Sequence, residues 1–130
     1  MRSFLSVTDL SPDEILATLD RAAKLKSGEP SDSLWGRVGV MIFEKPSLRT
    51  KLSFDVGINR LGGRAIYFNP DEVGIDTREP AADIARVISR MADFAVVRTF
   101  QHSLIVALDE AASIPVINAL TDGEHPCQAL

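Results

Sequence analysis

Short apolar segments alternate with helical patterns along the whole chain, and this alternation limits the folds open to it. Strands are expected at residues 37–43, 65–68, 94–97 and 116–118, and helices at about 12–27, 47–61, 80–91 and 103–113. Strands that are apolar on both faces and alternate with helices form parallel sheets covered on both sides. The sequence therefore predicts one α/β domain over residues 1–130, with a parallel sheet of about four strands and helices on both faces.

The expected helices carry their own start and stop signals. Ser11-Pro12-Asp13-Glu14 has the pattern of a capping box with proline in the first turn, and Gly28 is a natural stop. The 47–61 helix, which Gly62-Gly63 ends, is expected to bury Leu52, Phe54, Val56, Ile58 and Leu61. The 80–91 helix is expected to bury Ile84, Val87, Ile88 and Met91, and residues 69–79 to form a polar loop.

Composition excludes several classes of protein. The 130 residues are 45% apolar and 25% charged, and 14 basic against 18 acidic residues give a net charge of -4. Nucleic-acid binders usually have a basic excess, so no such partner is expected. Cys127 is the only cysteine, which excludes an intramolecular disulfide and favours a reducing compartment. We find no signal peptide pattern and no run that would span a membrane, so a cytoplasmic protein is expected.

The turn after the first strand is suited to anions. Ser47, Arg49 and Thr50 stand at the start of the helix that follows. The first N–H groups of a helix have no partner within it, and the helix dipole makes that end partly positive. Two hydroxyls and a guanidinium add donors and a fixed charge, so the turn is a candidate phosphate site.

Two more segments bring polar groups to the same edge of the predicted sheet. Arg98 ends the third strand, and the turn from His125 to Gln128 follows the fourth. In open α/β sheets, ligands bind outside the carboxyl ends of the strands. Taken singly, each residue has a simpler explanation: a hydroxyl as helix cap, an arginine as surface charge or ion-pair partner, and His125 as a cap. Their occurrence after three separate strands favours a binding site.

Two other chemistries receive little support. Cys127 near His125 could suggest a thiolate nucleophile, but no third orienting group is evident and a lone cysteine is usually part of the core. Asp71-Glu72 could suggest a metal site, yet these carboxylates lack partners at ligand spacing. We therefore expect neither a metal nor another cofactor.

Two motifs in the expected order carry a family resemblance. The stretch Phe43-Glu44-Lys45-Pro46-Ser47-Leu48-Arg49-Thr50, together with His125-Pro126-Cys127-Gln128, resembles the aspartate/ornithine carbamoyltransferase family. Within it, the chain is most similar to the amino-terminal carbamoyl-phosphate-binding domain of the ornithine branch. The resemblance implies a Rossmann-like carbamoyl-phosphate domain and no cofactor.

The resemblance also implies a role for each matching residue. Carbamoyl phosphate would be bound by Ser47, Leu48 (through its backbone N–H), Arg49, Thr50, Arg98, His125 and Gln128. The catalytic residues would be Arg98, which bridges phosphate and carbonyl oxygen, His125, which donates to that oxygen, and Gln128, which orients the carbamoyl nitrogen. Ornithine would be the acceptor and citrulline and phosphate the products, as in arginine biosynthesis.

Other features of the family imply parts outside this sequence. Family enzymes are trimers, and Glu72 and Arg78 are the candidates to reach a neighbouring subunit's site from the 69–79 loop. A second domain, absent from this chain, would bind ornithine, so the isolated chain is expected to be inactive alone. The surface on which the second domain would dock is expected to be an exposed apolar face of this chain.

Two substitutions depart from the family pattern. Leu48 replaces a frequent Thr, as in branches of the family that include enzymes for acylated ornithines, so the acceptor stays open. Lys51 replaces a frequent Arg, which keeps the charge but loses the forked donor geometry. Acylated ornithine, putrescine and aspartate are the alternative acceptors, because the second domain would hold the residues that distinguish them. A non-catalytic anion-binding or trimer-forming module is the other alternative.

Overall fold

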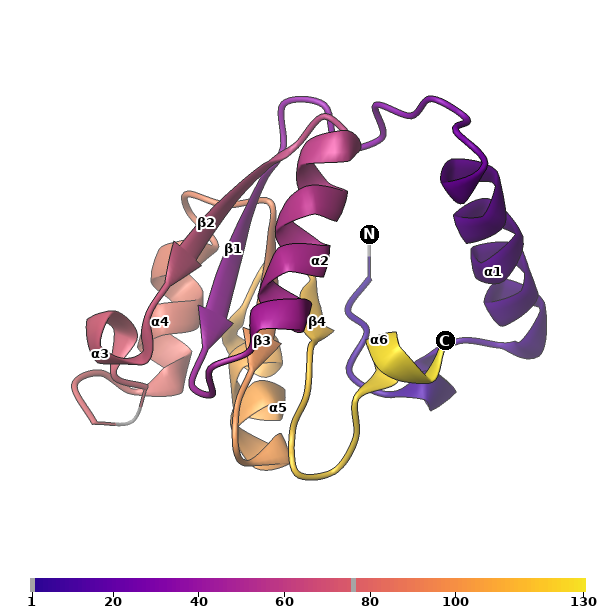
Figure 1. Ribbon diagram of the computed structural model, residues 1–130. Helices are drawn as coiled ribbons and strands as arrows, with labels where there is room; N and C mark the ends of the chain where they lie inside the picture. The colour runs from indigo at the N-terminus through magenta and orange to yellow at the C-terminus, as the bar shows by residue number, and fades with distance from the viewer. Residues whose placement is uncertain (1, 76) are drawn as a thin grey trace.

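The computed structural model of the protein describes residues 2–75 and 77–130, and its centre is one parallel sheet (Figure 1). The strands are β1 (Val38–Phe43), β2 (Arg64–Phe68), β3 (Phe94–Arg98) and β4 (Val116–Asn118), in the order β2-β1-β3-β4. All three neighbouring pairs are parallel, with Gly39 beside Phe94 and Phe43 beside Arg98. The predicted four-stranded parallel sheet is confirmed.

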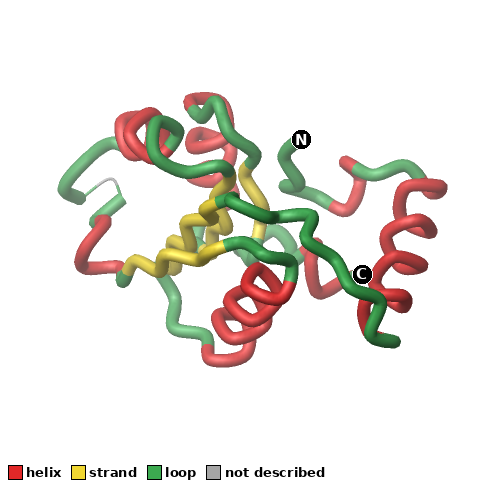
Figure 2. Tube along the Cα trace, turned by 90° about the horizontal axis from the view of Figure 1, so that it is seen from above, coloured by secondary structure: helices red, strands yellow, loops and turns green. Residues whose placement is uncertain are grey.

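Helices cover both faces of this sheet (Figure 2). On one face α4 (Ala81–Ile88) and α5 (His102–Ala111) pack against Val40, Ile42, Ala95, Val97 and Val116. On the other face α2 (Leu48–Arg60) packs through Ile58, in a cluster with Met41, Phe43, Phe94 and Val96. The alternation of apolar side chains along each strand supplies these two cores, because successive residues point to opposite faces.

The strand order creates a crevice at one edge. From β1 the chain crosses outward to β2, then returns past β1 to β3 and β4. The connections that leave β1 and β3 at their carboxyl ends therefore diverge, and this is where open α/β sheets bind ligands. The turn that opens α2 and the end of β3 both lie at this point.

Several helical side chains are less buried than their spacing predicts. Leu52 and Val56 of α2 are exposed, as are Val87 of α4 and Met91 beyond it, so the prediction that they are buried was wrong. The physical reason is that these residues lie on helix surfaces against which no described element packs. Ile58 and Ile84 are buried as expected.

The 69–79 segment is not simply a loop, because α3 (Pro70–Val73) interrupts it. Its carboxylate Glu72 accepts a hydrogen bond from the Asn69 N–H at 2.7 Å, which caps this short turn. Asp76, which the expected loop includes, lies outside the described residues.

The amino-terminal part of the chain has two roles. Phe4 pairs with Ile117 and extends the sheet beyond β4, and the short helix η1 (Val7–Asp9) follows. The capping box expected at Ser11 and Glu14 is present at the start of α1 (Pro12–Lys26). None of the described residues of α1 is buried, and the helix stands apart from the sheet (Figures 1 and 2). Among the described residues, we find no helix with the length and apolarity needed to cross a membrane.

Candidate functional site

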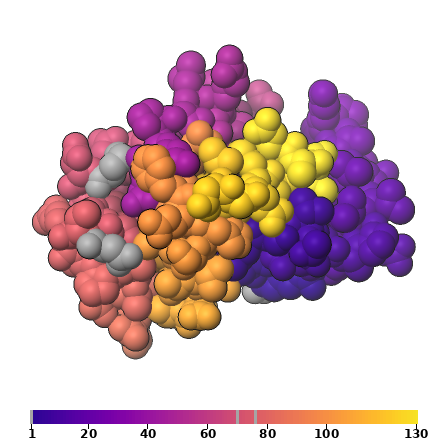
Figure 3. All heavy atoms as spheres, turned by 90° about the horizontal axis from the view of Figure 1, so that it is seen from below, coloured from indigo at the N-terminus to yellow at the C-terminus, as the bar shows by residue number. Residues whose placement is uncertain are grey.

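Three turns meet at the carboxyl edge of the sheet, and backbone hydrogen bonds hold them in register. The Glu44 N–H donates to the Arg98 carbonyl at 2.8 Å, so the turn after β1 is fixed to the end of β3. The Thr99 N–H donates to the Leu120 carbonyl at 3.0 Å, which joins the end of β3 to the loop after β4. Figure 3 shows these segments side by side on this face, in purple, orange and yellow.

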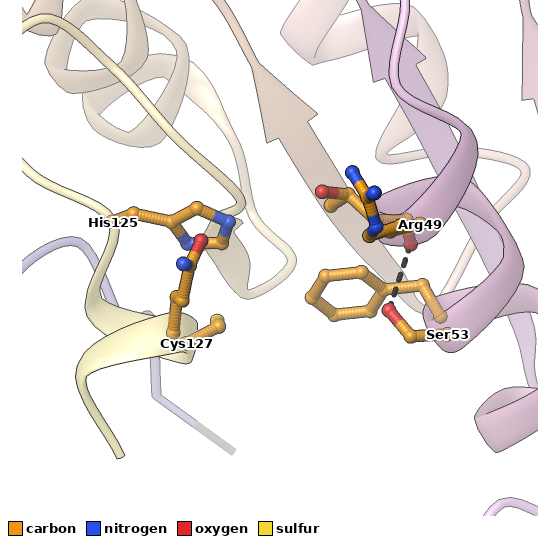
Figure 4. A pocket seen from close by; sticks show the side chains of 7 residues that line it. Arg49, Ser53, His125 and Cys127 are labelled. Carbon is orange, nitrogen blue, oxygen red and sulfur yellow. Dashed lines mark hydrogen bonds between the residues drawn. The ribbon is translucent and has the colours of Figure 1, made fainter.

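Two adjoining hollows lie between α2 and α6 (Pro126–Ala129). The first, of about 490 Å³, is lined by Arg49, Thr50, Ser53, Phe54, His125, Cys127 and Gln128. The second, of about 560 Å³, shares four of these residues and adds Ser47, Arg98, Leu120 and Ala129. In Figure 4, Arg49 and Ser53 face His125 and Cys127 across the first hollow. We call the two hollows together the anion cavity.

Two buried nitrogen atoms at the anion cavity lack a partner. Arg98 Nε and His125 Nδ1 have no hydrogen-bond acceptor or donor among the described residues. Arg98 Nη1 lies 3.5 Å from the Thr50 hydroxyl, which is a weak contact. Buried polar groups are rarely left unpaired, and the Nε–H of an arginine can only donate. The Nε–H of Arg98 therefore lacks an acceptor, which an oxyanion bound at the cavity that Arg98 lines would supply.

The first turn of α2 adds backbone donors. Ser47 is its N-cap, and its hydroxyl oxygen accepts from the Thr50 N–H at 3.3 Å. The N–H groups of Leu48 and Arg49 belong to the first turn, where the helix offers no carbonyl to bind them. Ser47 therefore acts as a cap for the Thr50 N–H, and the N–H groups of Leu48 and Arg49 stay at the partly positive helix end.

His125 stands in an unusual environment for a histidine. Burial lowers the pKa of its imidazole, and the positive charge of Arg98 lowers that pKa further. Both effects favour the neutral ring, because the charged form would be desolvated and would face a like charge. At pH 7 His125 is thus a neutral group that can donate one hydrogen bond without adding charge. It occupies the N-cap position of α6 but makes no capping hydrogen bond with its side chain.

Three of the predicted site residues bring no side chain to the anion cavity. The side chain of Leu48 is 82% exposed and lines neither hollow. Glu72 and Arg78 are exposed, and Arg78 Nη1 donates to the Glu72 carbonyl at 3.3 Å. Neither lines the anion cavity of its own chain, so their assignment to a neighbouring subunit's site stays a prediction.

Cys127 does not have the properties of a nucleophile. Burial raises the pKa of its thiol to about 11, and Sγ donates to the Asn118 carbonyl at 3.3 Å. A thiol in this state is protonated at neutral pH, whereas the thiolate is the reactive form. The alternative of thiolate chemistry is therefore rejected. Among the described residues, no group of three or more His, Cys, Asp or Glu side chains could hold a metal ion.

Sequence reasoning missed other residues at the site. Ser53 and Phe54 line the first hollow, and Leu120 lines the second with a positive φ of 138°. The spacing of Ser53 and Phe54, one turn beyond Arg49 and Thr50, was a signal that could have found them. Leucine rarely adopts a positive φ, so the sequence carries no signal for this conformation at Leu120.

Two lysines, one within the first motif and one directly after it, contact aromatic rings. Lys51 Nζ lies 3.4 Å from the centre of the Tyr67 ring, and Lys45 Nζ lies 4.3 Å from that of Phe100. Neither lysine lines the anion cavity, so the loss of a guanidinium at Lys51 does not remove a donor from it.

The comparison with known proteins agrees with this site. Residues 2–130 match the family model described as aspartate/ornithine carbamoyltransferase, carbamoyl-P binding domain. The chain is 48% identical over 133 residues to the ornithine carbamoyltransferase of Methanocorpusculum labreanum, covering 99% of this chain and 44% of that protein. The chain thus spans less than half the length of the curated relatives it matches.

Solved structures have the same fold. The anabolic ornithine carbamoyltransferase of Campylobacter jejuni superposes with a TM-score of 0.95 at 38% identity, over 99% of this chain and 42% of that one. A second solved structure is a mutant N-acetyl-L-ornithine transcarbamylase complexed with carbamyl phosphate and N-succinyl-L-norvaline. It superposes with a TM-score of 0.90 at 31% identity, over 98% of this chain and 45% of that one. With a family model that matches almost every residue, the chain belongs to the aspartate/ornithine carbamoyltransferase family, to its carbamoyl-phosphate-binding domain.

Proposed function

We propose that this chain supplies the carbamoyl-phosphate half of an ornithine carbamoyltransferase, which transfers the carbamoyl group to the side-chain amine of ornithine and releases citrulline and phosphate. The observation that carries the proposal is the pair of unpartnered buried nitrogens, Arg98 Nε and His125 Nδ1, at a cavity that also holds Arg49 and a helix N-terminus. A ligand with a dianionic end and a carbonyl oxygen suits such a set of donors.

The reaction asks for the chemistry that these side chains provide. The acceptor amine attacks the carbamoyl carbon, negative charge grows on the carbonyl oxygen, and the bond to the phosphate oxygen breaks. Arg98 and neutral His125 are proposed to donate to the carbonyl oxygen, and one well-placed donor of this kind typically lowers a barrier by ~3–4 kcal/mol.

The remaining donors act on the two ends of the substrate. Arg49, with the hydroxyls of Ser47 and Thr50 and the first-turn N–H groups, is proposed to bind the phosphate and stabilise it as it leaves. Gln128, whose side chain is exposed at the cavity, is proposed to orient the carbamoyl nitrogen. No step of this scheme requires a metal or an organic cofactor.

The acceptor, the assembly and the location belong to the proposal as well. Ornithine is favoured because the curated relative described above, at 48% identity, is an ornithine carbamoyltransferase. A second domain would bind the amino acid. The proposed working form is a homotrimer in the cytoplasm, in which Glu72 and Arg78 of one subunit reach the site of a neighbouring subunit. A screen with ornithine, N-acetylornithine, putrescine and aspartate, followed by phosphate release from a protein that includes the second domain, would identify the acceptor.

A calorimetric titration with carbamoyl phosphate tests the cavity itself. We expect saturable binding by the wild-type chain, and about 10–100-fold weaker binding by Arg49→Ala, since hydrogen bonds to charged groups are worth about 1.5–3 kcal/mol. Arg90→Ala is the matched control, because it removes the same charge from an exposed position that does not line the cavity.

Two results would contradict the proposal. Equal affinity in wild type and Arg49→Ala would remove Arg49 from the site. Loss of binding in Arg90→Ala to the same extent as in Arg49→Ala would show that net charge alone attracts the ligand.

A further inference from the structure

Asn118 is a completely buried polar residue at the end of β4, and its side chain binds three separate pieces of backbone. Its Nδ2 donates to the Leu5 carbonyl at 2.8 Å and, more weakly, to the Glu124 carbonyl at 3.4 Å. Its Oδ1 accepts from the Leu120 N–H at 2.9 Å. Both amide hydrogens meet carbonyls and the oxygen meets an N–H, so three of the four hydrogen bonds open to the amide are made and its orientation is determined by its partners.

Two of these partners, Leu120 and Glu124, belong to the loop of residues 119–124, which leads directly to His125. The Leu120 contact holds the first part of the loop, and the Glu124 contact holds the residue next to His125. The Leu5 contact joins both parts of the loop to the amino-terminal segment, in which Phe4 pairs with Ile117 of β4. One side chain thus connects the two ends of the loop to a segment more than a hundred residues away in the sequence.

The loop needs such a connection because its backbone is strained. Leu120 has a φ of 138°, a region that side chains other than glycine rarely adopt and that persists only when neighbouring contacts impose it. Its N–H is bound by Asn118 and its carbonyl by the Thr99 N–H, so both its peptide groups are fixed. Leu120 also lines the anion cavity beside Arg98 and His125.

A second set of contacts holds the same loop. The Thr121 hydroxyl lies 2.9 Å from His102 Nδ1 and accepts from the Gly123 N–H at 3.2 Å. The Glu124 carboxylate accepts from the Val7 N–H at 3.1 Å. Asn118 is the residue of this group whose side chain binds both Leu120 and Glu124.

We propose that Asn118 is a positioning residue of this site, whose amide holds the 119–124 loop in its strained form and so places His125 at the anion cavity. Its part in carbamoyl transfer rests on the proposed function, whereas the placement of His125 does not. Asn118 itself lines neither hollow and touches no substrate in this role.

The test follows His125 directly by NMR titration of the ring signals, which is practical because the chain has two histidines. Asn118→Ala removes all three hydrogen bonds. Asn118→Ser keeps an oxygen that can accept from the Leu120 N–H, as serine does in turns, but it is too short to reach Leu5 and Glu124. Ile84→Val, which removes one methyl group from the buried side of α4, controls for general loss of stability.

We expect the His125 pKa to rise toward its ordinary value of 6.5 in both Asn118 variants, since a released loop exposes the ring to water, and to stay unchanged in Ile84→Val. Affinity for carbamoyl phosphate should fall about tenfold if one molecule in ten keeps His125 in place. A merely structural asparagine would lower stability without moving the His125 titration in the folded protein.

Two other results would overturn the proposal. An unchanged His125 pKa in folded Asn118→Ser or Asn118→Ala would show that the loop keeps its form without the amide. Failure of both variants to fold, while Ile84→Val folds, would show that Asn118 serves the fold as a whole. Absence of carbamoyl phosphate binding in the wild-type chain would count against the proposed function only, because the titration of His125 requires no ligand.

Discussion

Gly39 of β1 lies against the ring of its sheet partner Phe94, so closely that a Cβ built on Gly39 would come within 2.3 Å of Phe94 Cζ. Phe94 is itself buried, so either its ring or the strands must shift to make room for a methyl group. We expect Gly39→Ala to lower the free energy of unfolding by about 1–3 kcal/mol through overpacking.

Gly57 in the middle of α2 provides the matched control. A Cβ there would meet nothing within 4 Å, so Gly57→Ala should raise the free energy of unfolding by roughly 0.5–1 kcal/mol. Urea unfolding of both variants measures the two effects. An unaffected Gly39→Ala would show that the strands can separate to admit a methyl group.

Asp93 joins the start of two strands and makes stability depend on pH. Its carboxylate accepts from the Val38 N–H at 2.8 Å and from Arg37 at 2.7 Å, and these bonds lower its pKa below the ordinary 3.8. Because the pKa of Asp93 is lower in the folded state than in the unfolded chain, its ionised carboxylate stabilises the fold above pH 3.8. This stabilisation is lost as the pH falls through the pKa of Asp93 in the folded state. Asp93→Asn should cost about 1–3 kcal/mol at pH 7, since one of its bonds then faces an amide N–H.

The cost of Asp93→Asn should disappear as the acid is titrated. Urea unfolding at pH 7 and at steps down to about pH 3 follows the difference between wild type and variant. Arg37→Gln, at a side chain that is 60% exposed, should have the smaller effect at pH 7. A difference between Asp93→Asn and wild type that stays constant with pH would contradict the assigned cause.

The sheet and the position of the site could be predicted from sequence because they follow from local patterns. Four short apolar runs separated by helices leave few arrangements other than a parallel sheet. The carboxyl ends of such strands share an edge, so Thr50, Arg98 and His125 had to come near one another. The caps at Ser11 and Ser47 were predictable for the same local reason.

What could not be predicted depends on contacts between distant segments. Periodicity identifies an apolar face on α2, but it does not say whether anything packs on that face, and Leu52 is 58% exposed. Asn118 looked like the last residue of a strand, because its partner Leu5 lies 113 positions earlier in the chain. The strain at Leu120 is imposed by its neighbours, so no property of leucine reveals it.

Cys127 should be slow to react despite lining the cavity. Since its thiol pKa is about 11, its thiolate fraction at pH 7 is lower than that of an ordinary thiol by about 100-fold. We expect iodoacetamide to alkylate it at least that much more slowly than it alkylates the urea-unfolded chain, as followed by mass spectrometry. Similar rates in the folded and unfolded chain would mean that the turn at Cys127 opens to solvent.

Arg98 is expected to act on both the ligand and His125, and the two effects can be separated. Arg98→Gln removes the positive charge that is the second cause of the lowered His125 pKa, so this pKa should rise, although only in part, because burial is the larger cause. It should also weaken carbamoyl phosphate binding about tenfold or more.

Arg49→Gln is the control for the effect of Arg98 on His125. It lines the same cavity but is not among the causes of the His125 shift, so affinity should fall while the His125 titration stays where it is in wild type. NMR titration of His125 and calorimetry on both variants give the two readouts. If the two arginine variants raised the His125 pKa equally, the field at His125 would come from the cavity as a whole and the specific link to Arg98 would be wrong.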